Sequence, residues 1–132
     1  MSQPLKLFLD ECCSKRLVKI INGAYLEDYP ELQTKHQSDF WNPGTKDSQW
    51  IPILAQEKDW DILTADRGKN SKLDKIQVIC SHYKVTHISM TPALINAGFK
   101  HQKHALLTLW PQIMRVRFLP VGTRFNGIQN GE

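Results

Sequence analysis

The chain has 132 residues, of which 41% are hydrophobic, and this size and composition fit one domain able to bury a sizeable core. It carries 17 basic and 13 acidic residues, and the resulting formal net charge of +4 favours a polyanionic or acidic partner. The sequence has no run of about 18 apolar residues and no signal-peptide pattern, which excludes a transmembrane segment and predicts a cytoplasmic protein.

The first half of the chain alternates short apolar runs with helical patterns. Residues 5–9 are apolar, brief and followed at once by Asp10, which indicates a buried strand. Ser14 can cap the helix that follows, and Gly23 can stop it. Pro52 is compatible with a later helix only near its first turn. The elements expected here are a strand over 5–9, a helix over 15–22, a weaker strand over 32–36 and a helix from 47 or 48 to 57.

The second half continues this alternation. Residues 60–65 form another short apolar run that ends at an aspartate, Asp66, and residues 73–83 have apolar positions at helical spacing. Pro111 blurs the end of the last expected helix. The elements expected here are a strand over 60–65, a helix over 73–83, a strand over 85–90, a helical turn over 91–98, a helix over 101–113 and a strand over 116–121.

The order of these elements predicts the fold. Strands separated by helices imply right-handed crossovers and a mostly parallel sheet with helices on both faces. We therefore expect an α/β fold, a three-layer α/β/α sandwich. No internal repeat and no long linker divides the chain, so we expect a single domain over residues 1–125 and a flexible tail over residues 126–132.

Acidic residues follow the two clearest strands. Asp10 and Asp66 would project from the carboxyl edge of the sheet, where open parallel sheets bind ligands. Asp47, at a helix start, could reach the same crevice, and Glu11 adds another carboxylate. Such a cluster repels itself unless a cation neutralises it, and Mg²⁺ or Mn²⁺ prefers oxygen ligands of this kind. The alternatives are that Asp47 is only an N-cap, that Glu11 faces solvent, and that Asp10 or Asp66 makes an Asx-turn.

Three segments together resemble one known family. They are Phe8-Leu9-Asp10-Glu11, residues 47–55 with the sequence DSQWIPILA, and residues 61–68 with the sequence DILTADRG. In this order and spacing they resemble the short PIN-like group related to VapC-type toxins. The resemblance covers about the first 90 residues of the chain. It implies a PIN-like sandwich and a Mg²⁺- or Mn²⁺-dependent endoribonuclease, the toxin of a bacterial toxin–antitoxin pair, silenced by a partner antitoxin.

The resemblance also implies roles for individual residues. Asp10, Asp47 and Asp66 match the family's acidic, metal-binding positions, and Glu11 stands beside them as a further catalytic carboxylate. Thr64 matches a threonine two residues before the last acid and is placed on the substrate side. Beyond Asp66, basic residues could contact RNA phosphates or could be ordinary exposed loop residues. They are Arg67, Lys69 and Lys72.

The chain departs from the common PIN pattern at two places. Cys12 stands where a serine or threonine is usual, and the next acid after Asp66 is Asp74, on an expected helix. A PIN-like scaffold without chemistry, binding a protein or RNA, is therefore an alternative. The three cysteines cannot pair evenly, so we expect reduced thiols, with Cys12 and Cys13 as small buried side chains. A homodimer is considered among the partners, whereas no sequence pattern predicts how single-stranded bases would be recognised.

A phosphoreceiver of the response-regulator type is the second alternative. It also uses an acidic pair after one strand, an aspartate after a later strand and a hydroxyl residue beyond the next. Asp10 with Glu11, then Asp66 and Thr91, imitate this pattern. Against it, residues 116–124 contain no lysine where a receiver has one.

Overall fold

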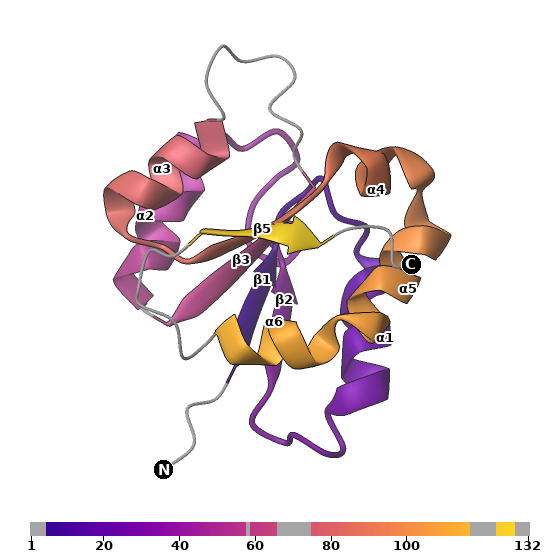
Figure 1. Ribbon diagram of the computed structural model, residues 1–132. Coiled ribbons are helices and arrows are strands. Elements are labelled where there is room, and N and C mark those ends of the chain that lie inside the picture. The colour runs from indigo at the N-terminus through magenta and orange to yellow at the C-terminus, as the bar shows by residue number, and fades with distance from the viewer. Residues whose placement is uncertain (1–4, 58, 66–74, 117–123, 129–132) are drawn as a thin grey trace.

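The computed structural model describes residues 5–57, 59–65, 75–116 and 124–128. Within these ranges the chain alternates strands and helices, as Figure 1 shows. The strands are β1 (Lys6–Leu9), β2 (Gln33–His36), β3 (Trp60–Thr64), β4 (His87–Met90) and β5 (Arg124–Ile128). The helices are α1 (Arg16–Tyr25), the 3-10 turn η1 (Gln37–Asp39), α2 (Asp47–Glu57), α3 (Lys75–Tyr83), α4 (Pro92–Ala97), α5 (Phe99–Thr108) and α6 (Trp110–Val116).

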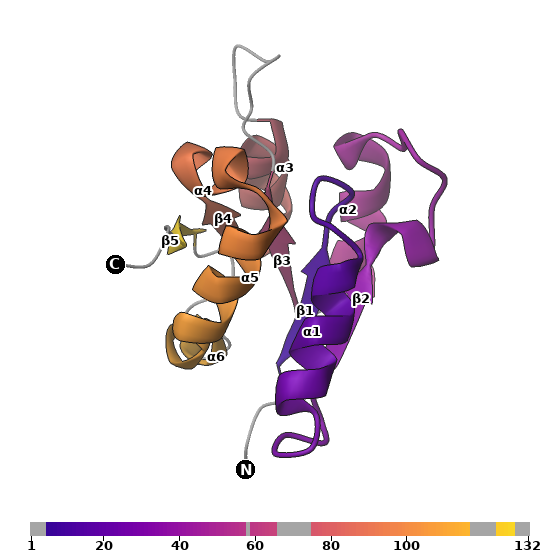
Figure 2. The same ribbon diagram turned by 90° about the vertical axis from the view of Figure 1, so that its right-hand side faces the viewer.

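The strands form one sheet in the order β2-β1-β3-β4-β5, which can be followed in Figure 2, and each neighbouring pair is parallel. The chain first moves from β1 to β2 and then crosses back to β3 on the other side of β1. The direction of winding therefore reverses between β1 and β3. Such a reversal opens a crevice beyond the carboxyl ends of the two strands, and ligands of doubly wound sheets bind there.

Two apolar cores lie on opposite faces of the sheet. Leu7 and Leu9 pack with α1, α4, α5 and α6 on one face, whereas Phe8 and Ile62 pack with α2 and α3 on the other (Figure 1). Alternate residues of β1 thus point to opposite faces, as the pleat of a strand requires. This arrangement confirms the predicted three-layer α/β/α sandwich. No helix in the described ranges is long and apolar enough to cross a membrane.

The N-terminal helix is longer than predicted. Ser14 Oγ accepts a hydrogen bond from the backbone N–H of Arg16 (3.2 Å), as expected of a residue that caps a helix. Gly23, however, does not stop α1, which continues to Tyr25. The Tyr25 ring stacks on Trp110 with centroids 4.1 Å apart. This packing outweighs the roughly 1 kcal/mol that a glycine costs inside a helix.

Two prolines act differently from the prediction. Pro52 lies inside α2, beyond its first turn. Because proline has no backbone N–H, the carbonyl of Ser48 lacks its helical donor, but Ser48 is exposed and its carbonyl can accept from water. The helix expected over residues 101–113 is instead two helices, because the backbone leaves the helical conformation at Leu109 (φ −95°, ψ 10°). Pro111 explains the break, since its ring conflicts with the preceding turn.

The last strand lies later than predicted. Val116, expected to begin a strand, ends α6 and is buried among the side chains on the α1 face. Residues 117–121 lie outside the described residues. The strand paired with β4 is Arg124–Ile128, so the flexible tail predicted from residue 126 begins inside β5. Hydrogen bonding to β4, which the local sequence does not reveal, fixes this position. The division into one domain and a tail stays a prediction.

Asp61, on β3, is an acidic side chain buried on one face of the sheet. Its side chain is buried beside Leu7, its neighbour in the parallel register. Burial, and secondarily the charge of Asp59, raises the pKa of Asp61 to about 7. Because the folded pKa exceeds the unfolded value, the folded state holds the proton more tightly. Stability should therefore fall as the pH rises from about 4 to about 7.

Asp61→Asn should accordingly raise the free energy of unfolding by about 1 to 4 kcal/mol at pH 8 and change it little at pH 4. Urea titrations of both proteins at the two pH values measure this. Asp59→Asn is the matched control and should give a smaller gain, since burial is the larger cause. An equal gain at both pH values would show that ionisation of Asp61 is not responsible.

Candidate active site

Asp10 stands at the carboxyl end of β1, where the direction of winding reverses. Its backbone N–H donates to the carbonyl of Leu63 (3.2 Å), which continues the parallel ladder by one step. Its side chain is only 2% exposed, and Oδ2 accepts a hydrogen bond of 2.5 Å from Thr64 Oγ1. Main chain and side chain thus join the ends of β1 and β3 at one carboxylate.

Thr64 lies deeper than the sequence suggests. Placed on the substrate side by the resemblance, it is fully buried and donates to Asp10, so it cannot present its hydroxyl to a large substrate. Its place suits a residue that orients the Asp10 carboxylate. In the register of the sheet its neighbour on β4 is Ser89, also buried.

Asp47, the first residue of α2, lies on the same side of the sheet as Asp10. Its Oδ1 accepts a hydrogen bond from the indole Nε1 of Trp50 (3.1 Å), one turn later in the helix. On α3, burial first, and then the charges of Asp47 and Asp10, raise the pKa of the Cys80 thiol to about 12. Both carboxylates therefore lie within electrostatic range of one thiol. The structure thus places two acids that are far apart in the sequence in the neighbourhood of Cys80.

Glu11 holds the loop that leads to Asp47. Its side chain is exposed, and Oε2 accepts a hydrogen bond from the backbone N–H of Gly44 (3.0 Å). Gly44 has φ +84°, a conformation that favours glycine. The backbone N–H of Glu11 donates to Gln37 Oε1 (3.0 Å), and Gln37 Nε2 donates to the carbonyl of Thr45 (3.4 Å). Glu11 and Gln37 thus fix the loop before α2 against the end of β1.

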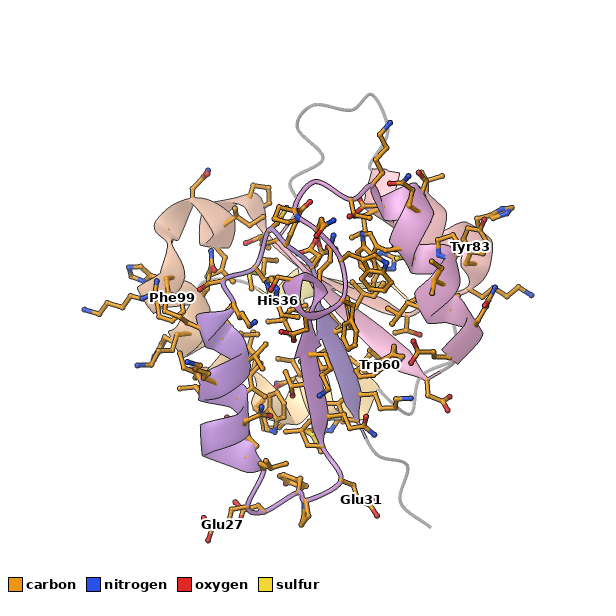
Figure 3. All side chains as sticks on the ribbon, turned by 180° about the vertical axis from the view of Figure 1, so that it is seen from behind. Glu27, Glu31, His36, Trp60, Tyr83 and Phe99 are labelled. Atoms are coloured by element: carbon orange, nitrogen blue, oxygen red, sulfur yellow. The ribbon has the colours of Figure 1, made fainter. Side chains whose placement is uncertain are left out.

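His36 holds the loop that follows Asp10 from the other side. It ends β2, and Figure 3 shows it near the carboxyl ends of the central strands. Its Nδ1 accepts from the backbone N–H of Ser38 (3.0 Å), so the proton lies on Nε2, which donates to the carbonyl of Cys13 (2.8 Å). The ring therefore acts as a neutral bridge between β2 and the loop after β1.

The cysteines differ from one another. Cys13 is buried as expected and donates to the carbonyl of Leu63 (3.6 Å), but Cys12 is exposed and not a buried side chain. Burial, followed by the charge of Asp10, raises the pKa of Cys13 well above its usual value. A thiol of this kind stays protonated and is a poor nucleophile. Cys13 is therefore not a candidate nucleophile of this site.

The donor chemistry of the site fits a hard divalent cation. Asp10 and Asp47 offer oxygen atoms, and Mg²⁺ is commonly held by one or two carboxylates, with water and substrate phosphate completing its ligands. Among the residues that the structure describes, no three His, Cys, Asp or Glu side chains are grouped so that they could hold a metal ion. Several predicted residues lie outside the described ranges: Asp66, Arg67, Lys69, Lys72 and Asp74.

These observations define a doubly wound α/β protein with a buried, hydrogen-bonded aspartate at its switch point. A family model described as PIN like domain matches residues 5–86, more than half of the chain. The chain therefore belongs to the PIN-like domain family, which has a nuclease-type fold and whose members commonly use divalent metal ions. Comparisons with curated proteins and with solved structures found no match. The family match spans β1 to α3 and includes Asp10, Thr64 and Asp47.

Proposed function

We propose that this protein is a Mg²⁺- or Mn²⁺-dependent endoribonuclease and the toxin of a bacterial toxin–antitoxin pair. One observation carries the nuclease part. In this PIN-like chain, Thr64 orients Asp10 at the switch point, and the Cys80 thiol lies within electrostatic range of both Asp10 and Asp47. The toxin role and the antitoxin come with the resemblance to VapC-type proteins and are part of the proposal, to which a homodimer is added as a further partner.

Each residue of the site has a task in this proposal. Asp10 and Asp47, with Asp66, would hold the ion, and Thr64 fixes the orientation of Asp10. Glu11 fixes the loop that carries Asp47. Basic residues after Asp66 would contact RNA phosphates. They are Arg67, Lys69 and Lys72. When bound, a divalent ion lowers the pKa of a coordinated water and offsets charge on the phosphodiester.

The two alternatives receive less support. Thr91, the hydroxyl residue that a phosphoreceiver would use, caps α4 by accepting a hydrogen bond from the backbone N–H of Leu94 (3.3 Å). The family match also favours a nuclease over a receiver. An inactive scaffold rests on Cys12 in place of serine or threonine. Cys12 is exposed, and it is Thr64 that orients Asp10. A cysteine in place of a serine or threonine at position 12 therefore leaves this orientation unchanged.

Removal of metal tests the proposed reaction. Purified protein should cut unstructured RNA in Mn²⁺ or Mg²⁺, lose this activity in excess EDTA, and regain it when Mn²⁺ is restored. Denaturing gels of an end-labelled RNA, with calorimetry of Mn²⁺ binding, measure both effects. Cleavage that persists in EDTA would point to a contaminating or metal-independent nuclease. Stable phosphorylation by acetyl phosphate without RNA cleavage would instead support the phosphoreceiver.

A further inference from the structure

We infer that Phe40, together with Lys35, forms a platform on which an unpaired RNA base stacks beside the site. This inference rests on the proposed function, since it names how the substrate is held there. The Phe40 side chain is 58% exposed, although it belongs to an aromatic cluster otherwise largely buried. Its ring stacks on Phe8, with centroids 6.0 Å apart and planes 25° from parallel. One face of Phe40 is thus held by the core, and the rest of the ring is open to solvent.

The edge strand β2 is uncovered on the α2 and α3 face. Thr34 and His36 are buried on the opposite face, whereas Gln33 and Lys35 are exposed on this one. Lys35 pairs with Phe8 in the parallel register, so the two side chains project to the same side of the sheet. The core on this face contains no residue of β2. Lys35 and the Phe40 ring are therefore both neighbours of Phe8 at this open edge.

The platform connects directly to the proposed catalytic acids. Phe8 lies two residues before Asp10 on β1, a separation of about 7 Å along a strand. Trp41, next to Phe40, packs on Trp50 with centroids 5.8 Å apart, and the Trp50 indole donates to Asp47. A base on the Phe40 ring would thus be linked through packed aromatic side chains to the residues beside Asp10 and Asp47, and these contacts would hold its position.

The charges on this surface suit a phosphate backbone. Lys35 makes no ion pair among the described residues, and the Lys6 ammonium lies 4.8 Å from the Trp60 ring on the same face (Trp60 is labelled in Figure 3). Asp39, the acid nearest to Phe40 in the sequence, is paired with Lys15 at 2.7 Å, which offsets its charge. Interleaved basic and aromatic side chains are the usual surface for single-stranded nucleic acid.

The test measures binding without cleavage. Fluorescence anisotropy of a short single-stranded RNA in EDTA reports affinity, and an RNA carrying 2-aminopurine reports stacking through quenching. Phe40→Ala should weaken binding about 5- to 100-fold and abolish the quenching. Phe40→Trp should preserve both. Lys35→Gln should weaken binding and reduce the slope of log affinity against log salt concentration by about one. Ile53→Ala, at an equally exposed apolar side chain on α2, is the matched control and should change nothing.

Several results would overturn the platform. Binding by Phe40→Ala within twofold of the original protein would do so, as would unchanged quenching. If Phe40→Ala unfolds, Phe40→Leu replaces it, because leucine keeps the contact with Phe8 and lacks an aromatic face. A change of oligomeric state with unchanged RNA binding would show that Phe40 serves a second copy of the chain. Binding that depends on Phe40, in a protein that cuts no RNA in Mn²⁺, would support the platform and reject the proposed nuclease.

Discussion

Asp10→Asn should lower the rate of RNA cleavage by more than about 100-fold. Removal of a residue that only orients a metal ligand typically costs roughly 10- to 100-fold, and Asp10 is proposed to be a ligand itself. Asparagine keeps an oxygen that can accept from Thr64, but it removes the charge that attracts a divalent ion. Mn²⁺ affinity should fall with the rate. Single-turnover cleavage at saturating RNA, together with calorimetric Mn²⁺ titration, measures both losses.

The same substitution should not destabilise the protein. The Asp10 carboxylate is buried, and burial disfavours its charged form when no cation is bound. Asparagine carries no charge and so avoids this cost. We expect the free energy of unfolding in EDTA to stay within about 1 kcal/mol of the original value or to rise. A variant that is less stable but still cuts RNA would show that Asp10 is structural. Asp28→Asn, at an exposed turn, controls for general loss of charge.

Thr64→Val separates orientation from metal binding. Valine has nearly the shape of threonine and removes the hydroxyl that donates to Asp10. The cleavage rate should fall about 10- to 100-fold, while the Asp10→Asn variant should lose little more when Thr64→Val is added. When two residues act as a unit, the losses of rate caused by their separate substitutions do not add. Independent losses in the double variant would show that Thr64 acts without Asp10, for instance through packing of β3.

The acids at the strand ends can be predicted from the sequence because each strand has a clear local pattern. A short apolar run that ends abruptly in aspartate marks both a buried strand and the edge at which it stops. Asp10 follows β1 in this way, and the parallel sheet then brings it to Thr64 at the end of β3. Local pattern and topology agree here. The correct prediction of the layers follows from this agreement.

Features that depend on distant partners could not be predicted. Gln37, in the loop after β2, is almost fully buried and joins the end of β1 to Thr45. No local pattern marks such a glutamine, because its partners are separated from it in the sequence. Phe40 likewise looks like an ordinary loop residue until Phe8 is found beneath it. The expected strand over residues 116–121 was wrong at Val116, which belongs to α6, and only pairing with β4 identifies Arg124–Ile128 as a strand.

Phe8→Ala should produce the largest loss of stability in the chain. The side chain is 1% exposed and stands at the centre of the aromatic cluster, with ring centroids 5.3 Å from Trp50, 5.8 Å from Trp60 and 6.0 Å from both Phe40 and Trp41. Removing a buried phenyl ring costs about 3 to 5 kcal/mol, a large share of the total stability of a small domain. Urea unfolding followed by tryptophan fluorescence and by circular dichroism measures the loss.

The matched variants show whether the cluster or the strand is responsible. Phe8→Leu keeps most of the buried volume and should cost about half as much or less. Ile53→Ala, at an exposed position on α2, should cost no more than about 0.5 kcal/mol. Because Phe8 supports the Phe40 ring and lies two residues from Asp10, Phe8→Leu should also weaken RNA binding while the protein remains folded. A cost below about 1 kcal/mol for Phe8→Ala would mean that the aromatic cluster collapses around the gap and does not hold β1 in place.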